Sequence, residues 1–242
     1  DVSAEAYHRH LIALAVDTYN IGFDELNFDY IRYPSDGPMK DIAFQNMNTM
    51  TKQENLETFF KYLQEELGNP EAFDAARHEN TGREKAVPYL SADLFGMTTS
   101  NTDDLSIGQV LERTLPYFDF VAPMVYPSHY PKTFLGLGDP NKNVYKVISY
   151  AMGEGVRRAA ATTTPNDAFV HSRIGTGTPA RYEKPAYDIQ KLRPWLQDFD
   201  YGGEYGVQEV RAQIQATYDV GLTSWMVWDP GNHYTRGAYA PE

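Results

Sequence analysis

Residues 23–37 read Phe-Asp-Glu-Leu-Asn-Phe-Asp-Tyr-Ile-Arg-Tyr-Pro-Ser-Asp-Gly. Polar and apolar residues alternate in this stretch, which is rich in aromatic rings and is closed by Pro34 and Gly37. Alternation with a period of two, bounded by turn residues, predicts a β-strand. The strand carries several carboxylates and one arginine, and the rest of the interpretation is built outward from it.

Helix and strand patterns alternate along the chain on both sides of this stretch. Helical spacing of apolar residues covers 4–21, 41–67, 105–116, 143–161 and 206–220, and strand patterns cover 23–34, 86–93, 118–126, 192–199 and 223–228. Residues 71–85 and 162–187 are polar connections in this interpretation. The alternation predicts a parallel sheet with helical crossovers, an α/β fold of the (β/α)8 TIM-barrel type. No linker divides the chain, so residues 1–242 are expected to form a single domain.

The composition excludes several classes of protein. The 242 residues include no cysteine, which rules out disulfide scaffolds, thiolate nucleophiles and cysteine-based zinc sites. The net charge of -12 disfavours a nucleic-acid partner. We expect no membrane span and no signal peptide within the sequence. The 18 Tyr, 12 Phe and 3 Trp suit either a sugar-binding surface or an aromatic core.

Alternation within the first two strands places polar groups on one face. Asn27 and Asp29 share a face of the first strand, and Ser91 and Asp93 share a face of the second. The outer face of a barrel strand packs against helices and takes apolar residues, so these polar side chains are expected inside. Asp29 and Asp93 are expected at the carboxyl ends of their strands.

The carboxyl ends of all five predicted strands collect polar or aromatic residues, namely Asp29, Asp93, Tyr126, Gln197, Asp198 and Trp228. Active sites of α/β barrels lie at this end. Two inward carboxylates on neighbouring strands suggest the acid/base pair of glycoside hydrolysis. Arg32 is expected to keep Asp29 ionised by charge pairing, or to form an unrelated salt bridge. His129 follows the third strand and is expected to line the pocket.

Several blocks of the sequence together resemble one known family. They are residues 23–37, Ser91-Ala92-Asp93-Leu94-Phe95-Gly96, the run from Ala122 to Tyr130, the run from Arg193 to Phe199, and Trp225-Met226-Val227-Trp228. In this order they resemble the "putative glycosyl hydrolase domain" family of bacterial proteins. The resemblance implies a (β/α)8 barrel akin to the α-amylase-type glycoside hydrolases, and a secreted or cell-envelope location.

The resemblance also implies roles for individual residues in cleavage of a polysaccharide or cell-wall glycan. By position, Asp29 is the nucleophile or base and Asp93 the general acid. From the residues themselves, we expect substrate to be held by Asn27, Arg32, Tyr126, His129, Gln197 and Asp198, and Trp228 to stack on a sugar. The sequence has no HExxH motif and no strand-end HxH, so we expect neither a metal nor another cofactor.

Two other functions remain open on the sequence alone. A glycan-binding barrel without catalysis would use the same rings and carboxylates, and it would bind glycan without turnover. A metal-dependent hydrolase or deacetylase would lose activity to a chelator.

The strand count raises a further expectation. Only five strands are predicted, and the resemblance makes the first of them the fourth of a barrel. The chain is therefore expected to hold the C-terminal five βα units, strands 4 to 8, without the N-terminal three strands, and to show a gap in the barrel wall.

Overall fold

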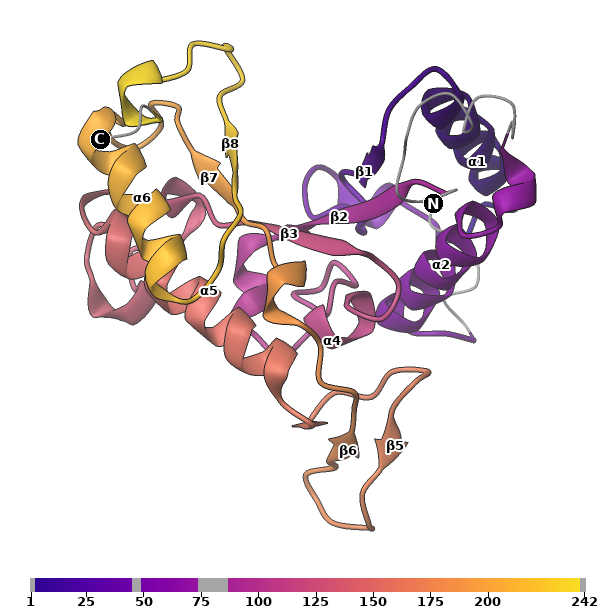
Figure 1. The fold of residues 1–242 in the computed structure, drawn as a ribbon. Coiled ribbons are helices and arrows are strands. Elements are labelled where there is room, and N and C mark those ends of the chain that lie inside the picture. The colour runs from indigo at the N-terminus through magenta and orange to yellow at the C-terminus, as the bar shows by residue number, and fades with distance from the viewer. Residues whose placement is uncertain (1–2, 45–48, 74–86, 240–242) are drawn as a thin grey trace.

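A computed structural model describes residues 3–44, 49–73 and 87–239 of the chain. Its main sheet has five parallel strands that follow one another in chain order: β1 (Glu25–Phe28), β2 (Tyr89–Phe95), β3 (Phe120–Met124), β7 (Trp195–Gln197) and β8 (Met226–Trp228). The sheet curls as half of a barrel, and β1 and β8 are its two edges (Figure 1). The mixed α/β architecture and the expected gap in the wall are therefore confirmed for the described residues.

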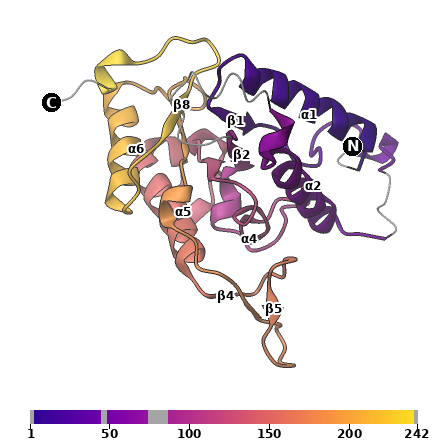
Figure 2. The ribbon, with the colours of Figure 1, turned by 45° about the vertical axis from the view of Figure 1, so that its right-hand side comes forward.

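Helices connect the strands and cover the outer face of the sheet. They are α1 (Glu5–Asn20), α2 (Lys52–Leu67), the single turn α4 (Leu111–Thr114), α5 (Val144–Ala160) and α6 (Val207–Asp219). Figure 2 shows α1 and α2 on the side of β1, and α5 and α6 on the side of β8. Fully buried side chains such as Leu63 of α2, Leu94 of β2 and Ile148 of α5 form the core between helices and sheet. No helix of the described ranges has the length and apolarity of a membrane span.

Short 3-10 turns complete the connections. They lie at Met39–Asp41, Pro70–Ala72, Gly96–Thr99, Pro127–His129, Phe134–Gly136, Pro140–Lys142, Ile189–Lys191 and Arg236–Ala238. Several of them follow the carboxyl end of a strand, so the chain turns tightly over the sheet at that end.

Residues 162–187 were expected to be a polar connection, and this expectation was wrong. They contain a small antiparallel sheet of β4 (Thr163–Thr164), β5 (Ser172–Arg173) and β6 (Tyr182–Glu183), in the order β4–β6–β5. This sheet projects from the body of the molecule below the end of α5 (Figure 1). Its strands are two residues long, which is too short for a period-two pattern to be visible in the sequence.

Two predicted helices are shorter than expected. The helix predicted over 41–67 begins only at Lys52, because the Thr51 side chain accepts a hydrogen bond from the Glu54 backbone and caps it. The helix predicted over 105–116 is reduced to α4, since Leu105 and Ser106 have positive φ angles of 51° and 60°. Residues 45–48, and 74–85 of the polar stretch, lie outside the described residues.

The strands also begin and end at other residues than predicted, which changes the residues found at their carboxyl ends. The strand predicted over 86–93 runs on to Phe95, so Asp93 lies inside β2 rather than at its end. β7 is only three residues long, so Asp198 follows it. Asn27 is in register with Ser91 across the β1–β2 pair, which brings the polar positions of both strands to the same level.

Candidate active site

Asp93 is the centre of the polar interior. Its Oδ1 accepts hydrogen bonds from Asn27 Nδ2 at 2.9 Å and from Trp195 Nε1 at 2.8 Å. Asn27 Nδ2 also donates to Ser91 Oγ at 2.9 Å. Side chains from β1, β2 and β7 thus meet inside the curl of the sheet, as the alternation predicted for Asn27, Ser91 and Asp93.

Burial changes the protonation of Asp93. The residue is only 4% exposed, and this loss of hydration raises the pKa of its carboxyl to about 6. The hydrogen bonds from Asn27 and Trp195 act in the opposite direction, since they favour the ionised form. The negative charge of Asp29 raises the pKa further. Asp93 therefore keeps its proton to a much higher pH than an ordinary aspartate.

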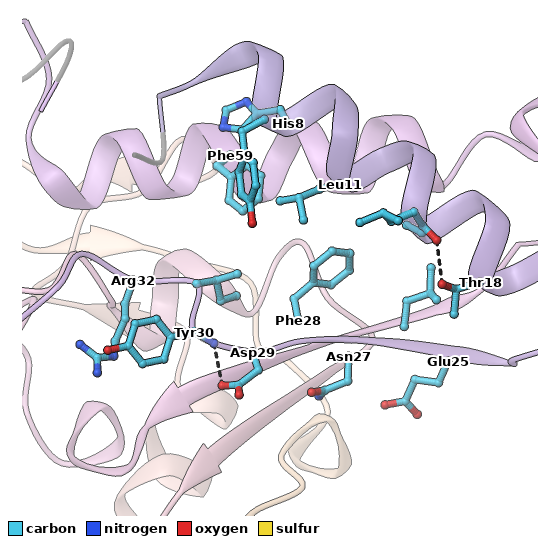
Figure 3. Close-up of a pocket in the computed structure, with 15 residues that line it drawn as sticks. His8, Leu11, Thr18, Glu25, Asn27, Phe28, Asp29, Tyr30, Arg32 and Phe59 are labelled. Atoms are coloured by element: carbon cyan, nitrogen blue, oxygen red, sulfur yellow. Dashed lines mark hydrogen bonds between the residues drawn. The ribbon is translucent and has the colours of Figure 1, made fainter.

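Asp29 lies directly after β1, at the mouth of the same interior. In Figure 3, Asn27 and Asp29 point away from α1, whereas Phe28 points toward it. Asp29 is exposed, and its Oδ1 accepts a hydrogen bond from Tyr30 N at 2.6 Å. Tyr30 has a φ of 57°, a left-handed backbone conformation that is strained for a bulky residue and is commonest at functional sites. The chain thus turns sharply where the carboxylate is presented.

An ion pair closes the interior below these carboxylates. Glu25 of β1 pairs with Arg193, the residue two before Trp195, and the Arg193 guanidinium lies 4.2 Å from the centre of the Phe120 ring. One face of β1, together with the position just beyond its end, therefore carries three polar side chains in succession along the strand: Glu25, Asn27 and Asp29. Stacked levels of inward side chains are typical of barrel interiors, with the reactive groups at the top.

Aromatic rings form a wall beside the carboxylates. The Tyr126 ring lies edge-on to His129 and Phe199, with 5.5 Å between ring centres in both pairs. Burial, and then the charges of Asp93 and Asp29, raise the pKa of the Tyr126 hydroxyl, so it stays protonated. Burial lowers the pKa of His129, which favours the neutral ring. The wall therefore offers a neutral hydroxyl and a neutral imidazole beside two carboxyl groups.

The wall continues outward through rings that reach solvent. Tyr201 lies 6.0 Å from His129 between ring centres and is 63% exposed. Trp228 of β8 is 42% exposed and meets Trp195 edge-on at 6.1 Å. Exposed rings of this kind are available for stacking on a ligand.

Two of the predicted site residues, Gln197 and Asp198, make hydrogen bonds that hold other parts of the chain in place. Gln197 is fully buried, accepting a hydrogen bond from Ser128 N at 3.2 Å and donating to Phe199 O at 2.9 Å. Its amide therefore holds the loops that carry the aromatic wall. Asp198 lies on the opposite face of the chain from Trp195, and its Oδ2 accepts hydrogen bonds from Thr235 N at 2.7 Å and from the Tyr239 hydroxyl. It is not brought together with Asp93.

Arg32 lies beside the site without pairing with Asp29. Its guanidinium carbon is 4.3 Å from the centre of the Tyr30 ring, and Nη1 donates to Ser35 Oγ at 3.1 Å. Figure 3 shows it pointing to the side of Tyr30 away from Asp29. The expected charge pairing is absent among the ion pairs of the described residues.

Sequence reasoning missed Trp195, although a signal for it existed. It is two residues before Gln197, so it had to share the inward face of the same strand. Phe199, Tyr201 and Tyr234 follow the carboxyl ends of β7 and β8 and were also missed. In the described part of the chain, no three His, Asp or Glu side chains are grouped in a way that would hold a metal ion.

Comparisons with solved structures find weak similarities. The glycoside hydrolase domain of PgaB (BpsB) from Bordetella bronchiseptica matches with a TM-score of 0.40 and 15% identity, over 75% of this chain and 39% of that one. The spore cortex-lytic enzyme SleL matches with TM-scores of 0.47 (Bacillus megaterium QM B1551, 12% identity) and 0.45 (Bacillus cereus, 13% identity). Both SleL matches cover 98% of this chain and 53% of the enzyme. The chain thus spans about half or less of these proteins.

Sequence comparison is more decisive. No curated protein sequence matches the chain at a significant level. The profile of one family, however, matches residues 1–234, nearly the whole length. The chain therefore belongs to the family described as "Putative glycosyl hydrolase domain".

Proposed function

We propose that this domain hydrolyses glycosidic bonds in a polysaccharide or cell-wall glycan, outside the cell or in its envelope. The observation that carries the proposal is the buried, protonatable Asp93 carboxyl, whose pKa is raised further by the charge of the exposed Asp29 carboxylate, beside a wall of aromatic rings. Glycoside hydrolysis needs two carboxyl groups in unlike environments, one that holds a proton and one that is ionised.

The environments of the two carboxyls suggest their roles. Asp93, with its pKa raised to about 6, would protonate the leaving oxygen. Asp29, exposed at the mouth, would attack the anomeric carbon or activate a water molecule. Trp228 and Tyr201 would stack on sugar rings, Tyr126 and His129 would contact sugar hydroxyls, and Arg32 would contact substrate at the rim. Gln197 and Asp198 would act indirectly, through the loops they hold.

A panel of polysaccharides, incubated with the wild-type protein and with Asp29→Asn, tests the proposal. The wild type should release shorter glycans, and the variant should lose at least 1,000-fold in rate, on the order of the loss when a catalytic group is removed. Asp36→Asn, an exposed carboxylate outside the carboxyl pair, is the matched control and should keep full activity. Full activity in Asp29→Asn would refute the assignment. Glycan binding without any release of product would favour a binding barrel.

The rate should also depend on pH in a defined direction. Asp93 must be protonated to act as the acid, so kcat/KM should fall as the pH rises through about 6. In Asp93→Asn this fall should disappear together with most of the activity. A rate that rises through pH 6 would mean that Asp93 acts as a base.

We further propose that β1, β2, β3, β7 and β8 are strands 4 to 8 of an eight-stranded barrel, in a single domain that lacks the first three strands. Three features support this. The sheet is open at β1 and β8, and α1 presents exposed apolar side chains, Tyr7 (56% exposed) and Leu14 (50% exposed), above the free edge of β1. A groove of about 590 Å³ lies between α1 and that edge (Figure 3), where a further βα unit would pack.

A further inference from the structure

The hydrogen bonds at Asp93 are all made to one of its two oxygens. Oδ1 accepts from Asn27 Nδ2 and from Trp195 Nε1, at 2.9 and 2.8 Å. Oδ2 accepts no hydrogen bond within the described part of the chain. A carboxyl oxygen has two lone pairs, and the indole N–H can donate but cannot accept. Both lone pairs of Oδ1 are directed at donors. When this carboxyl is protonated, the proton is therefore bound to Oδ2.

We propose that Trp195 and Asn27 are positioning residues that hold Asp93 through Oδ1 and leave the transferable proton on Oδ2. The inference rests on the proposed hydrolase function and deepens it, because it names the reacting atom of the acid. It also gives Trp195 a role beyond packing. The indole lies edge-on against Trp228, so one side chain orients the acid and supports an exposed ring for substrate.

The step is then defined atom by atom. The O–H bond of Oδ2 breaks and its proton moves to the glycosidic oxygen, while the bond from that oxygen to the anomeric carbon breaks. The leaving sugar departs as an alcohol. The new bond to the anomeric carbon is made either by an Asp29 carboxylate oxygen, or by a water molecule whose O–H bond breaks as its proton passes to the Asp29 carboxylate. Asp93 becomes a carboxylate, whose charge is stabilised by the two N–H groups already directed at Oδ1.

Trp195→Phe tests this role, because it removes the N–H donor and keeps an aromatic ring. A lost hydrogen bond to the ionised form raises the pKa of the carboxyl. We expect the fall of kcat/KM at high pH to move upward by about one pH unit and kcat to drop about tenfold. The pKa of Asp93 can also be measured without any substrate, by titrating the 13C signal of its carboxyl carbon. Asp93→Asn identifies that signal by its disappearance.

Trp225→Phe is the matched control. It removes the same N–H group at a tryptophan that donates to the Tyr218 hydroxyl at 3.0 Å, and it should leave the Asp93 titration unmoved. Asn27→Ala removes the other donor and should raise the Asp93 pKa as well. It serves as a second variant if Trp195→Phe melts at a much lower temperature than the wild type.

The outcomes separate the inference from the function on which it rests. An upward shift of the Asp93 signal in both donor variants, and none in Trp225→Phe, supports the positioning role even if no glycan is cleaved, a result that would overturn only the hydrolase proposal. An unmoved Asp93 titration in folded Trp195→Phe and Asn27→Ala overturns the inference, even if the wild-type protein cleaves glycan.

Discussion

At the scale of single residues, the environment of Asp93 has a consequence for stability. The folded protein favours its protonated form, with a pKa of about 6 against a usual value near 4. Folding raises the pKa of this carboxyl, so the folded state holds its proton more tightly than the unfolded state does. The free energy of unfolding therefore falls as the pH rises from about 4 through 6, where the carboxyl becomes ionised.

Asp93→Asn should remove this loss. Asparagine carries no charge, and its side-chain oxygen can still accept from Asn27 and Trp195. We expect the variant to exceed the wild type by on the order of 2 kcal/mol in free energy of unfolding at pH 8, with little difference at pH 4. Urea denaturation at both pH values measures this. The exposed Asp103→Asn should show no such pH-dependent gain, and a gain of equal size there would remove Asp93 as the cause.

At this scale, the sequence correctly predicted which side chains share one face of a strand. The period of two placed Asn27, Ser91 and Asp93 on one face, and their hydrogen bonds confirm it. The same alternation applied to β7 puts Trp195 on the inward face and Asp198 on the outward face. Asp198 was nevertheless predicted as a site residue, because the prediction relied on its place at the end of the strand and not on the face it occupies. The interaction of Arg32 could not be predicted, because it depends on the left-handed turn at Tyr30.

At the scale of secondary-structure elements, a buried ion pair joins α5 to α4. Arg158 of α5 pairs with Glu112 of α4, and both side chains are almost fully buried. The Arg158 guanidinium also donates to Thr98 O and Asn101 O, both at 2.6 Å. Its neighbour Arg157 pairs with Glu154 on the surface, where the Arg157 side chain is 65% exposed. Adjacent arginines on one helix thus have opposite environments.

Arg158→Ala should therefore destabilise far more than Arg157→Ala. Removing Arg158 leaves the Glu112 carboxylate buried without its cation and several carbonyls without a donor, at a cost of about 3–5 kcal/mol. Removing Arg157 breaks an exposed pair worth less than about 1 kcal/mol. Urea unfolding of the two variants gives the comparison directly. Equal losses would mean that the α5–α4 contact is not held by this ion pair.

The start of α2 is a second case in which a local motif decides an element. Thr51 and Glu54 form a capping box, in which Thr51 N donates to Glu54 Oε2 at 2.7 Å. Thr51→Ala should lower the free energy of unfolding by about 1 kcal/mol. Thr58→Ala, at an exposed position inside the same helix, should be neutral within about 0.5 kcal/mol. Thermal melts of both variants test the pair, and an equal effect would argue against the cap.

This motif also explains part of what sequence reasoning missed at this scale. The spacing Thr51-x-x-Glu54 signals a helix start, but the apolar spacing upstream carried the predicted helix back to residue 41. α4 is short because the preceding residues adopt positive φ angles, which Leu105 and Ser106 do not signal. Central strands and the long helices α1, α5 and α6 were predicted within a few residues, since each buries a periodic apolar face.

At the scale of the whole molecule, the strand count was the decisive prediction. Five strand patterns, taken with the family resemblance, predicted the last five strands of an incomplete barrel, and the sheet of the described residues has five strands in chain order, with β1 and β8 as edges. The arrangement leaves apolar surface uncovered on α1. Tyr7, Leu11 and Leu14 line the groove above the β1 edge at helical spacing. If three further βα units complete the barrel, this stripe is the surface that the nearest of them would cover.

The isolated chain of residues 1–242 should therefore behave as a protein with an uncovered apolar face. We expect it to bind the dye 1-anilinonaphthalene-8-sulfonate and to self-associate on size-exclusion chromatography. Leu14→Glu should reduce both signals at unchanged stability, because Leu14 is half exposed and a charge there can remain in water. Val170→Glu changes an equally apolar residue, 46% exposed on the chain before β5, and should reduce neither. If Leu14→Glu instead destabilises the isolated chain by more than about 2 kcal/mol, Leu14 is already buried there and α1 has no need of a further unit. A monomeric wild-type chain that binds no dye would equally contradict the half-barrel with an open edge.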